Sequence, residues 1–403
     1  MALGNALPGF NDWYTSTGPA LYSGPEEILN ELTKINYSLS YFMEGDMKKM
    51  LQGGTKITDS IYLTGDFDFG TYFPGQVETF NATNTLTMHE SPWRFERGKM
   101  SWTEAEVDLQ GSSQFSDTSR FQTFKRIKEQ KRENLMTGVS NGIEARIWAQ
   151  PNATLMESAT ATADAMHYSV PCFVNEFSAA QSGSAAGLYP GFTTLQQLSP
   201  TTYPNWDNQR YGYTSAGKVK STHDSSPNDL NRSLARARRK TKASPLPRGG
   251  GKNQAFDAPS FIACSDYGIW LYEQNLEAGN ERYRTMGRND GDYGGVNFDG
   301  IPLTYIEALD NAALYPDGNT PVTTLKTEAA ADIVGPRYYL INKPFLKMFF
   351  HVDHFFNMKA PYFLPQQPDV WVSLLDLWSN FFCRSRRRHA IVYPTVDQTA
   401  QTG

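Results

Sequence analysis

The chain has 403 residues, a length that allows one large domain or two connected domains with a sizeable core. Its formal net charge of -5 excludes a protein that binds nucleic acid through overall positive charge, so any such contact must be local. Charged residues form 20% of the chain, below the roughly 25% typical of globular proteins, and aromatic residues form 13%. This composition indicates either an aromatic-rich core or a surface that is buried against other copies of the chain.

The cysteines and the N-terminus indicate the cellular compartment in which the protein folds. Cys172, Cys264 and Cys383 lie far apart, which predicts a reducing compartment and neither a disulfide framework nor a zinc site. Residues 1–8 lack the basic and apolar segments of a signal peptide. No apolar stretch approaches the roughly 20 residues that span a bilayer, so we expect no membrane partner.

The first part of the chain predicts an arm followed by short elements. Residues 1–25 show no periodicity, which is typical of an extended arm. Pro25 and the two acids after it begin a helical pattern. A second short apolar run ends near Gly53.

Strand patterns begin near Ile61 and continue to Leu109. The segment Thr85–Met88 alternates between apolar and polar residues. With a polar turn around Glu90–Pro92, the pattern predicts a long β-hairpin. A two-stranded hairpin is marginal alone, so we expect it to lie on a neighbouring surface of the same subunit or of another one.

A change of phase is predicted within the second strand of this hairpin. Trp93 and Phe95 share one phase, whereas Met100 and Trp102 share the opposite one. The change falls at Gly98, where we expect a β-bulge.

The clearest helix of the chain is predicted from Gln114 to Trp148, with Ser116 or Asp117 as its N-cap. Apolar residues recur at three- and four-residue steps, and the helix would be about 50 Å long. Its middle carries a basic face, formed by Lys125, Arg126, Lys128, Lys131 and Arg132.

Residues 149–225 are poor in periodicity and predict irregular loops with short strands, such as 168–177. Ser226 and Pro227 then start another helix with a good cap. Its apolar side is predicted to be Leu230, Leu234 and Ala237, and its basic side Arg232, Arg236 and Arg239.

The last third of the chain predicts a sheet. Segments 260–272, 296–305 and 338–352 have strand patterns separated by glycine-rich turns. Segment 370–393 is densely apolar, and its pattern does not distinguish strand from helix.

Three segments resemble sites of chemistry only in part. Gly212–Val219 nearly matches a P-loop, but Val219 replaces the hydroxyl that binds magnesium, so we expect a solvated loop. His351–His354 holds three potential metal ligands, which alternation on a strand would place on two faces. Asp290 begins a calcium-like loop whose twelfth position is Ile301 instead of glutamate. We therefore predict no cofactor, no metal and no catalytic residue.

Basic tracts leave two interpretations open. They form either solvated faces with salt bridges between subunits, or contacts of low specificity with packaged DNA phosphates. For the second interpretation, the candidate DNA-facing residues are Lys125, Lys128, Lys131, Arg132, Arg238, Arg239, Arg386 and Arg387.

Three stretches carry a resemblance to a known family. They are Ser265–Gly268, Val296–Tyr305 with its Phe298-Asp-Gly-Ile-Pro302 run, and the closing segment Trp378–Val392 with its arginines. Together with the order of the predicted elements, they resemble the Hong Kong 97-type (HK97) family of phage major capsid proteins. The resemblance covers most of the chain in order.

The resemblance implies an α+β capsid fold with five segments. These are an N-terminal arm at 1–58, an extended β-hairpin loop at 59–113, and a peripheral domain at 114–225 with its spine helix at 114–148. An axial domain at 226–344 and a return to the peripheral domain at 345–403 follow.

The resemblance further implies a shell subunit of a tailed phage, located in the virion and assembled in the bacterial cytoplasm. Its partners would be other copies of itself in hexamers and pentamers, double-stranded DNA, a portal, and a separate scaffold or decoration protein. The hairpin residues expected at subunit interfaces are Trp93, Arg94, Trp102 and Glu104, since Trp and Arg dominate binding hot spots.

Two departures and two alternatives accompany this interpretation. The segment Gln76–Arg97 contains no lysine, so we expect no covalent cross-link from its tip such as some members form. No scaffolding segment with long charged helices is visible before the arm, so the resemblance implies a separate scaffold protein or assembly without one. The alternatives are another virion protein, such as a portal, tail-tube or minor shell component, and an enzyme that uses His351, Asp353 and His354.

Overall fold

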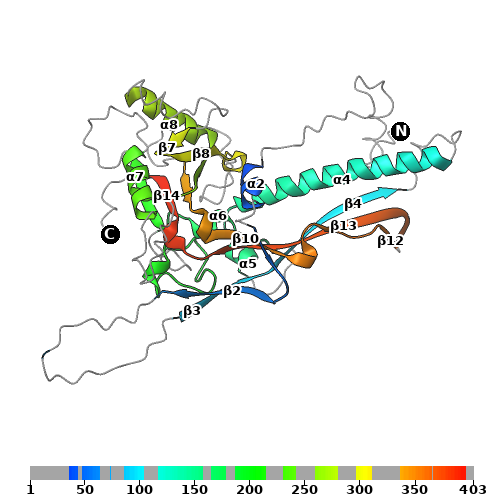
Figure 1. The fold of residues 1–403 in the computed structure, drawn as a ribbon, viewed down its shortest axis with the longest axis horizontal. Helices are drawn as coiled ribbons and strands as arrows, with labels where there is room; N and C mark the ends of the chain where they lie inside the picture. The colour runs from blue at the N-terminus through cyan, green and yellow to red at the C-terminus, as the bar shows by residue number, and fades with distance from the viewer. Residues whose placement is uncertain are drawn as a thin grey trace, which may run out of the picture. The chain divides into compact units, whose positions relative to one another are not determined.

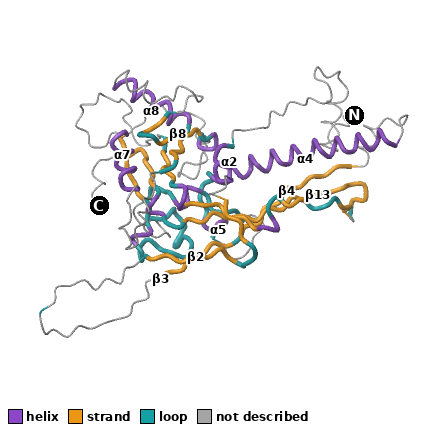
Figure 2. The backbone as a smooth tube through the Cα atoms, viewed as in Figure 1, coloured by secondary structure: helices purple, strands orange, loops and turns teal. Residues whose placement is uncertain are grey.

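The computed structural model describes residues 36–43, 48–63, 73, 86–103, 117–157, 165–177, 187–214, 230–241, 259–279, 296–310, 336–364 and 366–395 (Figures 1 and 2). The chain divides into two units. Unit 1 comprises Met1–Lys34, Arg97–Gly142 and Phe356–Asp376, and unit 2 comprises Ile35–Glu96, Ile143–Phe355 and Leu377–Gly403.

A six-stranded sheet forms the centre of unit 2, with strand order β5-β14-β9-β6-β8-β7. Strands β6 and β9 are buried at every position, because unit 2 covers both faces of the sheet there. The strands are β5 (Gln209–Thr214), β6 (Phe261–Cys264), β7 (Asn297–Phe298), β8 (Ile301–Tyr305), β9 (Tyr338–Ile341) and β14 (Ala390–Thr395).

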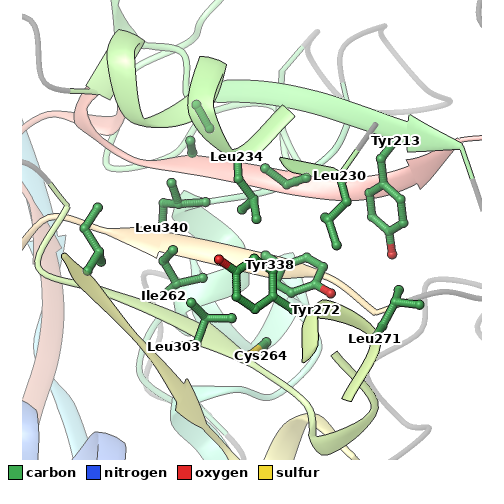
Figure 3. Packing of buried hydrophobic residues seen from close by; sticks show 14 of the residues in the cluster. Tyr213, Leu230, Leu234, Ile262, Cys264, Leu271, Tyr272, Leu303, Tyr338 and Leu340 are labelled. Atoms are coloured by element: carbon green, nitrogen blue, oxygen red, sulfur yellow. The ribbon is translucent and has the colours of Figure 1, made fainter. Parts of the chain in front are cut away.

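Two helices cover one face of this sheet. They are α7 (Leu230–Thr241), which packs on β5 and β14, and α8 (Asp266–Gly279), which packs on β8. Figure 3 shows their apolar side chains meeting those of the strands in one cluster. The buried α7 residues include Leu230, Leu234 and Ala237, which confirms the predicted apolar side of that helix.

The opposite face of the sheet packs against α2 (Tyr37–Met43) and the residues that follow the long helix. The ring of Trp148 lies 5.4 Å from that of Tyr339. The Glu144 carboxylate accepts hydrogen bonds from the backbone N–H groups of Ser38 and Leu39, at 3.2 and 2.6 Å. These bonds hold the start of α2 at the end of the long helix.

The remaining strands of unit 2 surround a second cluster of apolar side chains. Strand β1 (Lys48–Leu51) pairs in parallel with β10 (Leu346–His351), which pairs antiparallel with residues 379–383 of β13 (Gln367–Cys383). Strand β2 (Lys56–Tyr62) pairs antiparallel with β3 (Leu86–Pro92). Trp93, which follows β3, packs there against Ile57 and Phe382.

Unit 1 contains most of the long helix α4 (Asp117–Ile147) and of strand β4 (Arg94–Thr103). Strands β11 (Asn357–Met358) and β12 (Tyr362–Leu364) pair antiparallel with the first part of β13. The Asp376 carboxylate accepts from Arg97 and Lys359, at 2.7 and 2.8 Å.

Short helices complete the described elements: α5 (Ala153–Met156), α6 (Val170–Phe173), η1 (Pro204–Trp206), η2 (Glu307–Leu309), η4 (Lys343–Phe345), η5 (Val352–His354) and η6 (Arg386–Arg388). None of the helices that the structure describes is long and apolar enough to span a bilayer.

The long helix confirms one prediction, and the C-terminal strands decide a segment for which the sequence pattern fits both strand and helix. A helix predicted over 114–148 is observed over Asp117–Ile147. Segment 370–393, which the pattern left open, forms β13 and β14. The predicted arm at 1–25 and the helix start at Pro25 lie outside the described residues, as does the helix start at Ser226.

The predicted turn around Glu90–Pro92 is wrong. These residues belong to β3 and pair with β2, with Thr58 opposite Glu90 and Lys56 opposite Pro92. Strand β4 begins two residues later and pairs with β13. Alternation identified the strands, but pairing is chosen by tertiary contacts that a local pattern does not contain.

The predicted change of phase at Gly98 is wrong as well. Burial alternates along β4 without interruption, with Met100 and Trp102 in the buried phase and Phe95 in the exposed one. Instead, Gly98 permits a close approach: a Cβ there would lie 2.9 Å from side-chain atoms of Leu135 and Val139 on α4.

Two further strand predictions fail because short helices replace strands. Segment 260–272 is a strand only to Cys264 and then becomes α8, which begins at Asp266, an acid suited to a helix N-terminus. Segment 168–177 contains the helix α6 with Pro171 in its first turn. Both runs are short and rich in apolar residues, and apolar content alone does not separate the two structures.

Candidate interaction surfaces

The histidines considered as metal ligands lie in an aromatic cluster. His351 ends β10, and η5 follows it, so the expected strand stops before His354. The His354 ring stacks on Trp378 with centroids 3.7 Å apart, and His351 lies 5.0 Å from the same ring. Among the described residues, no group of three His, Cys, Asp or Glu side chains could hold a metal ion.

The three cysteines are free and buried. Burial raises the pKa of the Cys172 and Cys383 thiols to about 12 and also raises that of Cys264. Thiols held in the protonated form are poor nucleophiles. These cysteines therefore pack as small apolar side chains.

The first residues of the near P-loop form a strand. Gly212–Thr214 belong to β5 and pair with β14 instead of forming the expected solvated loop. The Ser233 hydroxyl donates to the Gly212 carbonyl, at 2.9 Å. Residues 215–219 lie outside the described part of the chain.

Three of the four predicted interface residues are buried within the chain. Trp93 is 5% exposed, and Arg94 and Trp102 are 2% exposed. Trp93 Nε1 donates to the Gly54 carbonyl at 3.0 Å, and Arg94 donates to the Met156 carbonyl. The expectation that these side chains present themselves to a neighbour is therefore wrong. Glu104 lies outside the described residues.

The predicted DNA-facing residues do not form one set. On α4, Lys128 and Lys131 are half-buried and Arg132 is exposed, whereas the side chain of Lys125 lies outside the described part of the chain. Lys131 Nζ donates to the Ser101 carbonyl at 3.0 Å. Among these positions, Arg132 is the exposed positive charge on α4.

The remaining candidates separate by burial. Arg239 is exposed, and Arg238 forms an ion pair with Asp299. Arg387 is exposed, with Nη1 at 3.1 Å from Asn205 Oδ1. Arg386, in contrast, is completely buried, so the expectation that it faces DNA is wrong.

Arg386 belongs to a buried polar network. Its guanidinium donates to the carbonyls of Phe173 and Gly187 and to Asn208 Oδ1, at 2.9 to 3.1 Å. Arg210 also donates to the Gly187 carbonyl, at 3.1 Å, and forms two hydrogen bonds with Asp207, of 2.6 and 2.5 Å. Burial lowers the pKa of Arg386 to about 10, which still leaves it charged at neutral pH. The network joins four segments of the chain, at Phe173, Gly187, 207–210 and Arg386.

Exposed apolar side chains mark three surfaces that the sequence analysis did not select. The first is the outer face of the β2–β3 ribbon, where Leu86 and Met88 are exposed and Met88 lies opposite Ser60. The other face of the ribbon packs inward through Ile57 and His89. In the described part of the ribbon, two apolar side chains are therefore exposed on the outer face, beside the polar residues Ser60 and Glu90.

The second surface is the end of the β12–β13 hairpin in unit 1. Phe363 lies opposite Trp371 with ring centroids 3.6 Å apart, and Tyr362 lies opposite Val372. Successive residues of a strand point to opposite faces, so each face carries an aromatic side chain. Tyr362 and Phe363 are both exposed.

The third surface is the outer side of α8 in unit 2. Tyr267 and Trp270 are each 47% exposed, and their rings stack with centroids 5.5 Å apart. Asp266 directly precedes Tyr267 in α8. Its backbone N–H donates to Asp310 Oδ1 at 3.0 Å, so two carboxylates lie at this end of the aromatic pair. The family resemblance includes the run Ser265–Gly268. It does not predict that the aromatic side chains of this segment are exposed.

Exposed apolar side chains on three separate surfaces, aromatic on two of them, are typical of sites that bind other proteins. None of them adjoins a recognisable group of catalytic side chains in the described parts of the chain.

The structure is similar to solved capsid proteins. It matches a chain of the cyanophage A-1(L) capsid asymmetric unit with a TM-score of 0.53 and 12% identity, over 94% of this chain and 96% of that one. A chain from the capsid of a native GTA particle gives 0.46 and 9%, over 93% and 96%. A chain from the capsid of cyanophage P-SCSP1u gives 0.42 and 11%, over 93% of both chains.

No protein-family model matches the sequence, and no curated protein matches it. At this low identity the similarity concerns the fold, and it extends over nearly the whole of both chains in the cyanophage A-1(L) comparison. The mixed helix and sheet architecture described above therefore has the HK97-like fold of phage capsid proteins.

Proposed function

We propose that this protein is the shell-forming major capsid protein of a tailed double-stranded DNA phage. In this role it assembles into hexamers and pentamers of an icosahedral shell. The single observation that carries the proposal is the fold shared with the cyanophage A-1(L) capsid chain over 94% of this chain. Full coverage matters because a shared fold over one small domain would fit many unrelated functions.

The exposed apolar surfaces support assembly as the activity. A shell subunit must bind several neighbours at once, so it needs several separate contact surfaces. The outer face of β2–β3, the β12–β13 hairpin end and the outer side of α8 provide three. Many modest contacts add up in a closed symmetric assembly.

The five segments that the family resemblance implies stay part of this proposal. The arm at 1–58, the extended loop at 59–113 and the axial domain at 226–344 would contact neighbours around the peripheral domain. The pairing of β2 with β3 supports a loop whose base would be these two strands.

Contact with packaged DNA is the proposed role of the accessible basic residues. Arg132 and Arg387 are exposed, and phosphate neutralisation of low specificity requires only accessible positive charge. We propose no such role for Arg386, because it is buried. A portal and a separate scaffold or decoration protein are the further proposed partners, and the proposed location is the virion, after assembly in the bacterial cytoplasm.

Negative-stain electron microscopy of the purified full chain tests the proposal. Expressed alone and together with its neighbouring phage genes, the protein should form uniform icosahedral shells or rings of five and six subunits. A dispersed monomer or dimer in both preparations, even at high concentration, would contradict the proposal and return attention to the histidine cluster at His351 and His354.

A further inference from the structure

We propose that two surfaces of unit 2 with opposite charges bind each other between neighbouring copies of this chain. The basic surface is a stripe on α7, formed by Arg232, Arg236 and Arg239. The acidic surface is a stripe on α8, formed by Asp266, Trp270 and Glu273. This inference rests on the proposed function, since it specifies one of the contacts by which shell subunits would meet.

The α7 stripe lies opposite the buried side of its helix. Its three arginines are spaced at i, i+4 and i+7, so they follow one another along one face, and all three are exposed. Helix α7 contains no acidic residue. Arg236 also lies 5.6 Å from the ring of Tyr211, which supports its side chain on the outer side of the helix. Arg238, which pairs with Asp299, is outside the stripe.

The α8 stripe has the same spacing with the opposite charge. Asp266, Trp270 and Glu273 also follow one another at i, i+4 and i+7. Asp266 and Trp270 are exposed and Glu273 is half-buried. Tyr267 stacks on Trp270 and widens the apolar centre of the stripe, while Asp310 adds a second carboxylate at its start.

The two stripes match in size as well as in charge. Seven residues of helix rise by about 10 Å, so both stripes span the same length. Trp, Tyr and Arg are the residue types that contribute most to protein interfaces. Asp266 and Glu273, on either side of Trp270, would then pair with Arg232 and Arg239, on either side of Arg236.

The placement of the helices favours contact between copies arranged head to tail. Helices α7 and α8 cover the same face of the central sheet, but α7 packs on β5 and β14, whereas α8 packs on β8 near the other end of the strand order. Two different surfaces on one subunit give a heterologous contact, which closes into a ring when the rotation between subunits allows it.

Packaged DNA is the competing occupant of the α7 stripe. Phosphates would suit the arginines equally well. DNA would, however, leave the α8 stripe without a partner and would be repelled by its carboxylates. A second copy of the chain provides partners for both stripes at once, which is why we favour it.

Charge reversal in the full-length chain tests the inference. The variants are R236E/R239E, D266K/E273K and the combination of all four substitutions. Assembly is measured by sedimentation velocity and negative-stain microscopy, and folding by circular dichroism and thermal unfolding. The matched control R236K/R239K keeps the positive charge and should assemble as the unmodified protein does.

We expect each reversed pair to reduce the assembled fraction about tenfold or more, because like charges would then face each other. The combined variant should recover assembly, since its charges are again complementary. Recovery by the combined variant also shows that the individual losses did not come from misfolding.

Four results would overturn the inference. One is normal assembly of both reversed pairs, which leaves the shell function intact and removes only this contact. A second is a folded combined variant that stays unassembled when both pairs fail. A third is normal assembly of R236E/R239E with less packaged DNA, which would assign the α7 stripe to DNA. Absence of rings and shells for the unmodified protein would instead contradict the proposed function itself, and this inference with it.

Discussion

Two tryptophans of unit 2, Trp93 and Trp270, show how similar residues serve different purposes. Trp93 is enclosed by Ile57 and Phe382 and donates a hydrogen bond to the Gly54 carbonyl. Trp270 stands on the outer side of α8, 47% exposed, and stacks only on Tyr267 among the rings described. Trp93 therefore stabilises the single subunit, whereas Trp270 is available to a neighbour. Residue type alone does not separate the two roles.

Truncating each tryptophan should give the largest contrast. Trp93→Ala should lower the free energy of unfolding by about 3–5 kcal/mol, because it empties a buried cluster. Trp270→Ala should change it by about 0.5 kcal/mol or less, yet it should weaken assembly. Urea unfolding of the unassembled subunit and sedimentation of the assembled protein measure the two effects. Equal losses of stability would contradict the contrast.

The adjacent arginines Arg386 and Arg387 differ in the same way as the two tryptophans, since the first is buried and the second is exposed. Arg386→Ala should cost about 3 kcal/mol of stability, because the Phe173 carbonyl loses this buried donor, while the Gly187 carbonyl and the Asn208 side chain keep Arg210 but lose Arg386. Arg387→Ala, on the exposed neighbour, should cost about 0.5 kcal/mol or less. Thermal and urea unfolding of the two variants would decide, and a stable R386A variant would show that water replaces the guanidinium.

Substitutions at two glycines distinguish the cost of steric crowding from the cost of a left-handed backbone conformation. Gly187 and Gly300 both have φ of +83°, but a Cβ at Gly187 would lie 2.7 Å from Asp207 Oδ1, whereas a Cβ at Gly300 would meet nothing within 4 Å. Gly300→Ala should cost about 1 kcal/mol for its left-handed backbone alone. Gly187→Ala should cost about 1–2 kcal/mol more, since it also displaces Asp207 from Arg210. Equal losses in unfolding experiments would show that Asp207 moves freely.

A further expected effect concerns the dependence of stability on pH. Burial lowers the pKa of His89 from 6.5 to about 4, although the Asp59 charge opposes the shift and Arg384 reinforces it. The unfolded chain therefore binds the proton first, and stability contributed by neutral His89 is lost as the pH falls from about 6.5 towards 4. His389, with a pKa lowered to about 3 by burial, acts in the same direction.

His89→Phe should reduce this pH dependence, because its ring can keep the stacking on Phe382 without binding a proton. The measurement is the free energy of unfolding of both proteins between about pH 7 and pH 5. Burial raises the pKa of Glu157 to about 7, which acts in the opposite direction but equally in both proteins. Identical slopes for the two proteins would contradict the assignment to His89.

Several features follow from the sequence alone because they depend on neighbouring residues. The helix Asp117–Ile147 and the apolar side of α7 are predicted by apolar residues that recur at every third or fourth position. Such residues lie on one face of a helix. The resemblance of Ser265–Gly268 and the stretches that follow implies the capsid fold that the structure has.

Other features were decided by the tertiary structure, because they depend on contacts between distant segments. Alternation marked β3 and β4 as strands, but only the folded chain pairs β3 with β2 and β4 with β13. Arg386 and Arg387 are neighbours in one basic run, and the fold buries the first against Gly187 while it leaves the second exposed. Burial of a side chain is a property of everything that surrounds it, and most of those surroundings lie far away along the chain.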